Sequence, residues 1–350
     1  MVGIICEYNP FHNGHLYHLN KVKELFPNEV ITLVLVGNFL NRGDLSVINK
    51  WDKTKLALDY GIDLVVELPF AFATQSADIY AYGAINILDN LKCDYLVFGS
   101  ELNNIDVLYK IANTNIDIKD LLKKGYNYPK AVDIALKDKI NISINTPNNL
   151  LGVSYIKAIK KLNSKIKPIT IKRTNDYHDK NTNGKISSAS SIRNLIYENK
   201  DISKYVPNTN YIKNINLNDF YLIIKHKIIT EDLTKYQDID ISLNSLLKKN
   251  ILKSNNIEEL ISNVKHKNYT YNRIKRCLVH ILCCLDKKDY KLEYIKILGF
   301  NSKGRQYLNK IKKEVTLPLL TKYDNYELLV DNIYNLISKD TIKNKPILKK

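Results

Sequence analysis

Two histidines at positions 12 and 15 offer the most specific chemistry in this chain, within the segment His12-Asn13-Gly14-His15. Imidazoles one helical turn apart can both hydrogen-bond one phosphate group. They can then stabilise the negative charge that builds on it during in-line displacement. Gly14 removes a Cβ where a nucleobase or ribose would press on the backbone. Because so short a motif also occurs by chance, the histidines could instead be surface or metal-binding residues. The position of the motif in the fold distinguishes these alternatives.

The flanking sequence places this motif in a strand-to-helix turn. Residues 2–8 (VGIICEY) form an apolar run that is typical of a strand buried on both faces of a parallel sheet. An amphipathic segment, LYHLNKVKELF, follows the motif and ends before Pro27. Parallel sheets bind ligands at the carboxyl ends of their strands, and the free N–H groups of a helix start attract phosphates. The position therefore favours phosphate chemistry.

Buried strands alternate with helical segments through the first half of the chain. We expect strands at residues 2–8, 31–39, 63–69, 93–100 and 167–173. Such alternation implies right-handed crossovers and predicts an α/β fold with a doubly wound parallel sheet. Residues 101–150 read as helical, with an insertion around residues 123–132, and a helix is expected from residue 150 to 162.

The second half of the chain reads as helical and basic. Helices are expected near residues 215–229, 240–252, 256–265, 270–286, 289–297 and 302–314. The formal net charge is +17, yet residues 1–150 carry 14 Lys/Arg against 17 Asp/Glu, which leaves the excess in residues 151–350. Positive charge concentrated in one part of a protein is typical of a surface that binds a polyanion such as a nucleic acid. We therefore predict a nucleotide-binding domain over residues 1–200 and a basic C-terminal α-helical domain over residues 201–350.

Two segments of the helical half could contact RNA. Residues 265–276 (KHKNYTYNRIKR) interleave basic side chains with Tyr269 and Tyr271, which could stack on unpaired bases, and residues 301–305 (NSKGR) add a basic loop. A solvated helical face is the alternative for each.

The five cysteines form no CxxC pair and lie mostly in apolar runs, which favours buried thiols in a reducing compartment. With no signal-like start and no apolar window long enough to span a bilayer, we expect a cytoplasmic protein without membrane contact. No protein partner is evident.

An ordered set of motifs resembles a known family. The segment EYNPFHNGHLYH (7–18) resembles the signature of the HxGH nucleotidyltransferase superfamily. The whole set is similar to the bacterial tRNA(Met) cytidine acetate ligase family. The likeness rests on the segments GNFLNRGD (37–44), NKW (49–51), DLVVELP (63–69), FGSE (98–101), PNNLLG (147–152), IKR and DYHD within 171–179, and SASSIR (188–193), and more weakly on YTYNRIKRCLVHIL and GFNSKGR.

The resemblance implies a two-step reaction with ATP as a substrate. Acetate would attack the α-phosphate to give acetyl-adenylate and pyrophosphate, and Mg²⁺ is expected to help pyrophosphate leave. The wobble cytidine of elongator tRNA(Met) would then accept the acetyl group and become N4-acetylcytidine. His12 and His15 would be catalytic. The implied ATP-binding residues are Ile5, Cys6, Glu7, Tyr8, Asn9, Pro10, Phe11, His12, Asn13, Gly14, His15, Leu16, Tyr17, His18, Gly99, Asn148 and Arg173.

The residues themselves agree with parts of this assignment. Gly99 ends a buried strand, where a missing side chain lets a nucleotide approach, although an ordinary turn is the alternative. Arg173 leaves a strand and could grip phosphate. Asn148 is expected in a loop before a helix, where it could cap the helix or bind the ligand, and Asn149 is an equal candidate for the contact.

A second phosphate-binding element is implied at SASSIR, through Ser188 and Arg193. Ala189 replaces a serine that is usual there, which puts part of this contact in doubt. Arg42 and Asp44 could face acetate or magnesium pyrophosphate, or could form a salt-bridged loop. No protein-held metal site is predicted, because His178 lacks partner spacing.

Two rival functions use the same features. A small-molecule adenylyl- or cytidylyltransferase would share the histidine chemistry but would not need a basic second half. A non-catalytic RNA-binding protein that kept a nucleotide pocket would not need the histidine pair.

Overall fold

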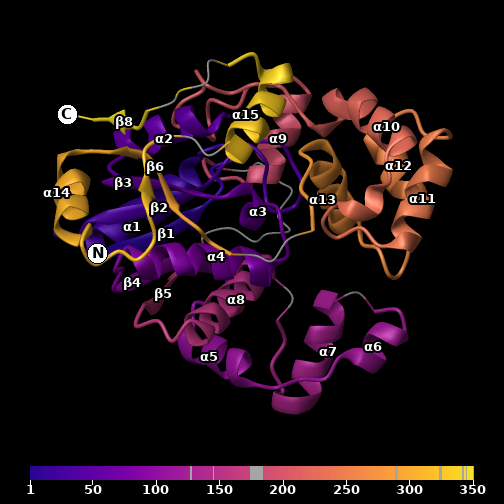
Figure 1. The fold of residues 1–350 in the computed structure, drawn as a ribbon. Helices are drawn as coiled ribbons and strands as arrows, with labels where there is room; N and C mark the ends of the chain where they lie inside the picture. Colours follow the sequence, from indigo (N-terminus) through magenta and orange to yellow (C-terminus); the bar gives the residue numbers. More distant parts are fainter. Residues whose placement is uncertain are drawn as a thin grey trace.

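The computed structural model describes residues 1–126, 128–144, 146–173, 184–287, 291–322, 325–340, 343 and 345–349. Within these residues, one mostly parallel sheet of eight strands is flanked by helices (Figure 1). Its order is β5-β4-β1-β2-β3-β6-β7, with β8 paired to β6. The strands are β1 (Val2–Cys6), β2 (Ile31–Val36), β3 (Leu64–Leu68), β4 (Tyr95–Ser100), β5 (Lys167–Lys172), β6 (Ile295–Phe300), β7 (Leu319–Leu320) and β8 (Ile347–Leu348).

The strand order reverses at β1. The chain runs outward from β1 to β2 and β3, and it then returns to β4 on the other side of β1, with all these pairs parallel. Such a switch point opens a crevice at the carboxyl ends of the two central strands. The predicted α/β fold with a parallel sheet is confirmed, and the crevice lies where the histidine motif begins.

Helices cover both faces of this sheet and extend beyond it. The helices of the sheet region are α1 (Asn13–Leu25), α2 (Lys50–Asp59), α3 (Phe70–Ala73), α4 (Ala77–Asn90), α5 (Ile105–Asn113), α6 (Lys119–Lys123), α7 (Tyr128–Ile140), α8 (Pro147–Lys161) and α9 (Ala189–Tyr197). Those of the later part are η1 (Leu217–Phe220), α10 (Tyr221–Thr230), η2 (Leu233–Lys235), α11 (Ile241–Ile251), α12 (Ile257–Val264), α13 (Tyr271–Leu282), α14 (Ser302–Ile311) and α15 (Asn325–Ser338).

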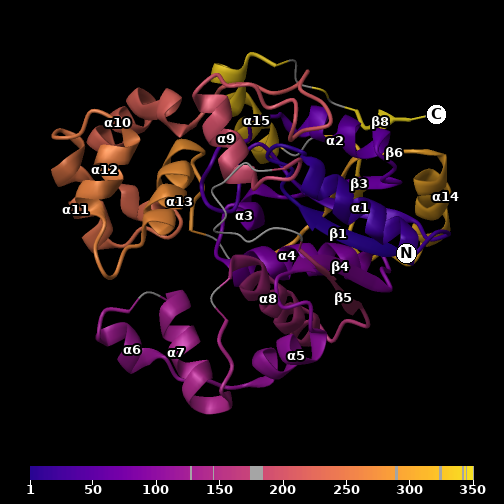
Figure 2. The same ribbon diagram turned by 180° about the vertical axis from the view of Figure 1, so that it is seen from behind.

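Three hydrophobic cores hold these layers together. One core packs α4, α5 and α8 against one sheet face, and a second packs α1, α2 and α9 against the other. The third lies mainly within residues 215–285, where α10 to α13 form a bundle beside the sheet (Figure 2). The helical character predicted for this part is confirmed, while the division at residue 200 into separate domains stays a prediction.

The helix predicted at residues 289–297 is wrong, because residues 295–300 form β6. This strand pairs antiparallel with β3, and Lys296 lies opposite Glu67 in the register. A short apolar run cannot be assigned to strand or helix by periodicity alone. Here the run forms a strand because it pairs with the edge of β3, which lies more than 200 residues away in the sequence.

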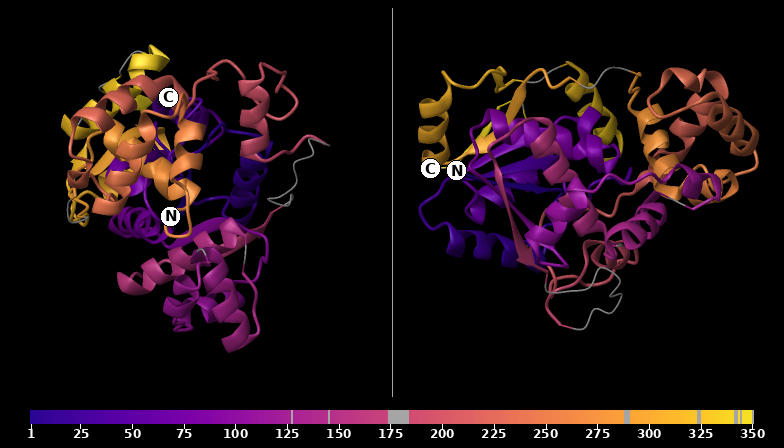
Figure 3. Two further views of the ribbon diagram at one scale, coloured as in Figure 1. Left: turned by 90° about the vertical axis from the view of Figure 1, so that its right-hand side faces the viewer. Right: turned by 90° about the horizontal axis from the view of Figure 1, so that it is seen from below.

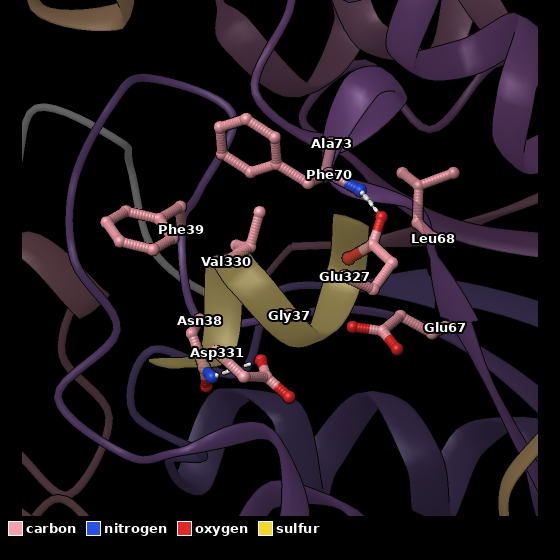
Figure 4. Close-up of a pocket in the computed structure, with 10 residues that line it drawn as sticks. All are labelled: Gly37, Asn38, Phe39, Glu67, Leu68, Phe70, Ala73, Glu327, Val330 and Asp331. Atoms are coloured by element: carbon pink, nitrogen blue, oxygen red, sulfur yellow. Dashed lines mark hydrogen bonds between the residues drawn. The ribbon is translucent and has the colours of Figure 1, made fainter. Parts of the chain in front are cut away.

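Several ionisable side chains are buried where α15 meets β3 and α2. Lys50 is fully buried, and its Nζ lies 2.6 Å from Glu67 Oε1 and 2.9 Å from Asp331 Oδ2. A small pocket adjoins this cluster (Figure 4), where Glu327 Oε1 accepts a 2.8 Å hydrogen bond from the backbone N–H of Phe70. The pocket lining includes none of the residues in the histidine motif. It belongs to the packing of α15 onto the sheet.

Burial, together with the nearby Glu67, raises the pKa of Glu327 to about 8. The folded state therefore holds a proton that an unfolded glutamate releases above pH 4 to 5. This stabilisation is complete at low pH and is lost as the pH rises through about 8, at up to about 1.4 kcal/mol per pH unit.

We expect Glu327→Gln to flatten this pH dependence, because the amide mimics the protonated acid and keeps the bond to Phe70. Urea unfolding at pH 6 and pH 9 measures it, with the exposed Glu24→Gln as the control. An equally steep loss of stability in Glu327→Gln would contradict the assignment.

Candidate active site

The two histidines of the motif cap helix α1 and lie ring against ring. His12 is the N-cap residue, and its Nδ1 accepts a 3.0 Å hydrogen bond from the N–H of Gly14. His15 Nδ1 accepts from the N–H of His12 at 3.3 Å, and the two ring centroids are 3.9 Å apart. Because both Nδ1 atoms accept, the proton of each neutral ring lies on Nε2. That nitrogen can donate to an oxygen.

Gly14 is a glycine for a reason within the protein itself. A Cβ at this position would lie 2.7 Å from Cε1 and 2.9 Å from Nδ1 of His12, closer than real Cβ contacts allow. The His12 ring therefore occupies the space that we expected a nucleotide to need. The glycine secures the ring position of the N-cap histidine.

Burial keeps the histidines of α1 uncharged. It lowers the pKa of His12 to about 3, with Arg173 and Arg193 adding to the shift. The pKa of His15 is lowered by burial, His12 and Arg173, and that of His18 falls to about 4 through burial and Arg173. Three neutral imidazoles therefore share a region whose positive charge comes from two guanidinium groups. His18 Nε2 is buried and makes no hydrogen bond with the residues that the structure describes.

The loop before the histidines is held in an unusual backbone conformation. Tyr8 has φ of 48° and is buried. Beside it, the buried Lys53 donates to the carbonyl oxygens of Glu7 (3.0 Å), Val36 (2.8 Å) and Gly37 (2.7 Å). Burial lowers the pKa of Lys53 to about 7. This lysine joins the chain after β1 to the end of β2, and sequence reasoning missed it.

Asn9 and Arg193 fix the same loop from two sides. Asn9 donates to Leu45 O and accepts from the N–H of Val47 at 2.8 Å. Arg193 donates to Asn9 O at 2.9 Å, and another of its nitrogens lies 4.0 Å from Asp44. Ser188, the other predicted phosphate-binding residue, is the N-cap of α9 and accepts from the N–H of Ser191. The SASSIR segment thus packs beside the histidine motif.

Asp44 forms a salt-bridged loop, which was one of the two alternatives. Its carboxylate pairs with Lys275 of α13 and faces Arg193. A Cβ at Gly43 would clash with the α13 backbone at 2.7 Å, so the loop lies directly against that helix. This contact connects the helical bundle with the chain that surrounds the histidines.

Glu101 holds together two residues that were predicted to bind ATP, Arg173 and Asn148. It lies 3.5 Å from Arg173 Nε and accepts a 2.5 Å hydrogen bond from Asn148 Nδ2. A Cβ at Gly99 would meet Arg173 Cγ at 3.2 Å, so the missing side chain makes room for this arginine. Glu101 was missed as a site residue, although its position just after the FGS of β4 was a usable signal.

The structure separates Asn148 from Asn149. Both lie in the first turn of α8, not in a loop before it, because the helix begins at Pro147. Asn149 is buried, accepts from Ser100 Oγ (2.7 Å) and the N–H of Glu101 (3.1 Å), and donates to Thr146. Its amide is thus committed to the protein, whereas Asn148 faces the charged pair of Glu101 and Arg173.

We therefore expect Asn149→Ala to lower the free energy of unfolding by about 1–3 kcal/mol, because it leaves buried donors without an acceptor. Asn148→Ala should cost less than about 1 kcal/mol and should instead weaken ATP binding. Urea unfolding and ATP titration of both variants compare the two, each serving as the other's control. Equal stability losses would contradict this division of roles.

The predicted ATP-binding run of residues 5–18 contains two kinds of residue. Ile5, Tyr8 and Phe11 are buried in the hydrophobic cores, and Phe11 packs on Tyr60 at a centroid distance of 5.0 Å. Side chains such as Glu7 and Asn13 are partly accessible. For the buried members, contact with ATP stays a prediction.

The expected stacking role of Tyr269 is not supported, whereas that of Tyr271 stays a prediction. Tyr269 is 5% exposed and its hydroxyl donates to Asp240 at 2.5 Å, while the Tyr271 hydroxyl donates to Glu258. Arg273 lies over the Tyr269 ring at 4.9 Å. The Tyr269 ring is therefore a structural part of the bundle, while the Tyr271 ring remains partly accessible.

Residues 301–305 (NSKGR) were expected as a basic loop, but they form the N-cap and first turn of α14 and lie at the amino ends of the strands. Asn301 bonds Asp63 just before β3, and Lys303 donates to Glu29 O at 2.6 Å. A Cβ at Gly304 would lie 2.1 Å from Asp63 O. This helix start anchors α14 to the sheet away from the histidines, so it is no part of an RNA surface near them.

The described residues hold no cluster of three or more His, Cys, Asp or Glu side chains suited to a metal ion. His178 and the rest of DYHD lie outside the described residues. Among the helices that the structure describes, none has the length and apolar character of a membrane span.

Comparison with known proteins gives a consistent result over the whole chain. A family model described as HIGH Nucleotidyl Transferase matches residues 1–346. A tRNA(Met) cytidine acetate ligase of Caldicellulosiruptor saccharolyticus is 43% identical over 93% of this chain and 87% of its own length. The enzyme of the same name from Anoxybacillus flavithermus is 36% identical over 97% and 93%.

Solved structures agree with the sequence relatives. The crystal structure of Thermotoga maritima TmcAL without ligand superposes with a TM-score of 0.89 at 28% identity and covers 99% of both chains. The same Thermotoga protein bound with alpha-thio ATP gives a TM-score of 0.85, also at 28% identity and 99% coverage of both chains.

Proposed function

Because the chain belongs to the HIGH nucleotidyl transferase family, and within it to the tRNA(Met) cytidine acetate ligases, we propose that it acetylates the wobble cytidine of elongator tRNA(Met). It would do so in two steps, with ATP and acetate as the other substrates. The observation that carries the proposal is the pair of neutral imidazoles at the first strand-to-helix turn, with two guanidinium groups nearby.

In the first step, an acetate oxygen forms a bond to the α-phosphorus of ATP. The bond from that phosphorus to the bridging oxygen breaks, and pyrophosphate leaves with the electron pair. Nε2–H groups of His12 and His15 donate to α-phosphate oxygens as negative charge builds there. Donors already fixed by the cap of α1 need no reorganisation during the reaction.

Around these two histidines we propose an ATP site that includes Arg173, Asn148 and the end of β4 at Gly99. Glu101 holds Arg173 and Asn148 beside each other before ATP arrives. His18 Nε2, buried and unpaired among the described residues, would gain a ligand partner. Arg193 and Ser188 would face the leaving phosphates, and Arg193 already donates to the loop that precedes His12.

Mg²⁺ would accompany the phosphates without a protein-held site. The carboxylates near the proposed triphosphate are Glu101, which is paired with Arg173 and Asn148, and Asp44, which is paired with Lys275. Because both already have cationic or amide partners, they do not form a ready site for a hard cation that prefers oxygen ligands. No step above depends on the metal.

In the second step, the exocyclic amine of the cytidine attacks the carbonyl carbon of acetyl-adenylate. The nitrogen loses a proton, AMP leaves, and N4-acetylcytidine remains. The excess positive charge of residues 151–350 supports a tRNA partner. Since that partner is a tRNA, the cytoplasm is the proposed place of action.

Incubation of the protein with ATP, labelled acetate and elongator tRNA(Met) tests the proposal, and label in the tRNA at the wobble position is the expected result. Pyrophosphate exchange into ATP should require acetate. Exchange that requires a mononucleotide instead would replace the proposal with a small-molecule adenylyl- or cytidylyltransferase. No acetate-dependent exchange and no labelled tRNA would overturn it.

A further inference from the structure

Two turns that are far apart in the sequence carry exposed lysines and meet in space. One, the α6 tip, comprises residues 122–126 (LKKGY). The other, the α13 turn, comprises residues 265–268 (KHKN) before helix α13. A Cβ built on Gly125 would lie 3.6 Å from Cδ of Lys267, so the two segments are direct neighbours.

The α6 tip is a formed helix end. Gly125 has φ of +90° and donates to Leu122 O at 2.9 Å, and Tyr126 N–H donates to Leu121 O at 3.2 Å. This reversal leaves Lys123 and Lys124 exposed and leaves Tyr126 43% exposed. A rigid turn therefore presents two charges and one aromatic ring to solvent.

The α13 turn is equally well formed. His266 and Tyr269 exchange backbone hydrogen bonds of 3.3 and 3.1 Å, and the buried Tyr269 anchors the turn through Asp240. Lys265, His266 and Lys267 remain exposed. The buried tyrosine, which cannot stack on a base, thus holds the lysines outward.

Both turns lie on the side of the molecule where the strands end. β1 starts at the N-terminus, and Figure 1 draws α6, α7 and the bundle of α10 to α13 on the opposite side. The left panel of Figure 3 shows α6 and α7 below the bundle from another direction. The phosphate chemistry proposed above belongs to this same end of the sheet.

Four exposed lysines in touching turns repel each other, and this repulsion needs a counterion. Asp120 Oδ1 lies 3.3 Å from Lys123 Nζ, but both side chains are about four-fifths exposed or more and the pair contributes little. A polyanion relieves such repulsion and releases its own counterions. Tyr126 beside the lysines would offer a face for an unpaired base.

We propose that the α6 tip and the α13 turn form one RNA-binding surface. The segment after β4 that carries α6 would then bind tRNA together with the helical bundle of α10 to α13. The proposal rests on the tRNA substrate proposed above and adds the place where it is held. It differs from the expectation that the basic C-terminal half alone binds RNA.

Charge reversal on each turn tests this surface. Lys123→Glu/Lys124→Glu and Lys265→Glu/Lys267→Glu should each weaken binding of an elongator tRNA(Met) transcript by about 10-fold or more at about 0.1 M salt. Each should also reduce the salt slope by about 1 to 2, because two phosphate contacts are lost. Acetate-dependent pyrophosphate exchange without tRNA should stay within about twofold of wild type.

Lys310→Glu/Lys313→Glu, on exposed residues at the end of α14 on the far side of the sheet, is the matched control and should leave binding nearly unchanged. Wild-type affinity in the α6-tip variant would overturn the shared surface, as would an equal loss in the α14 control. Absence of exchange in the unaltered protein would instead overturn the proposed reaction, which this binding measurement does not require.

Discussion

Replacement of His12 by asparagine should lower the rate of acetate-dependent pyrophosphate exchange by about 100-fold or more. The loss of one preorganised donor to a developing oxyanion typically costs this much. Asparagine is a good N-cap residue, so its carbonyl oxygen can accept the Gly14 N–H that His12 Nδ1 accepts now. The variant therefore removes the imidazole and keeps the cap of α1.

Measuring the free energy of unfolding distinguishes a loss of catalysis in His12→Asn from a loss of folding. We expect the free energy of unfolding of His12→Asn to stay within about 1 kcal/mol of wild type, the size of a typical cap effect. His226→Asn, an exposed histidine of α10, is the control and should exchange at the wild-type rate. If His12→Asn folded normally and kept more than a tenth of the exchange rate, the proposed role of the imidazole would have to be abandoned.

Replacement of Lys50 by methionine should lower the free energy of unfolding by about 3–5 kcal/mol, because it removes the ammonium group that pairs directly with buried Glu67 and Asp331. Methionine has nearly the same shape, so the loss would come from charge and not from a cavity. Urea unfolding at pH 7 measures it.

Lys55→Met, on the exposed face of the same helix α2, is the matched control and should cost at most about 1 kcal/mol, the size of its contact with Tyr211. A loss in Lys50→Met no larger than in Lys55→Met would mean that the buried carboxylates take up protons at no cost. The ionic cluster would then not stabilise the junction of α15 with the sheet.

Local sequence was sufficient to predict where the two histidines of the candidate site lie in the fold. The apolar run before His12, the turn and the amphipathic helix after it are contiguous, so their order alone placed the imidazoles at the end of a buried strand. The five parallel strands were predicted for the same reason. Each is a short apolar run between helical segments, and the structure moves their ends by a few residues only.

Long-range contacts explain what sequence reasoning missed. Glu101 and Arg173 are 72 residues apart, Lys50 and Asp331 far more, and no local pattern marks either pair. The interleaved tyrosines and basic residues suggested that Tyr269 stacks on RNA bases, yet this tyrosine is buried and Asp240 holds its hydroxyl. Asp240 is the N-cap of α11, and only the folded bundle brings it to Tyr269.

The late position of β6 and α15 in the chain has a consequence for folding during synthesis. Until residue 300 has left the ribosome, β3 has an unpaired edge, and such an edge can pair with other chains. Lys50 and Glu67 also remain without Asp331 until this residue, the last of the three to be synthesised, is available. The edge of β3 is therefore unpaired through most of the synthesis of the chain. The final fifth of the chain then covers this edge with β6 and completes the ionic cluster of Lys50, Glu67 and Asp331.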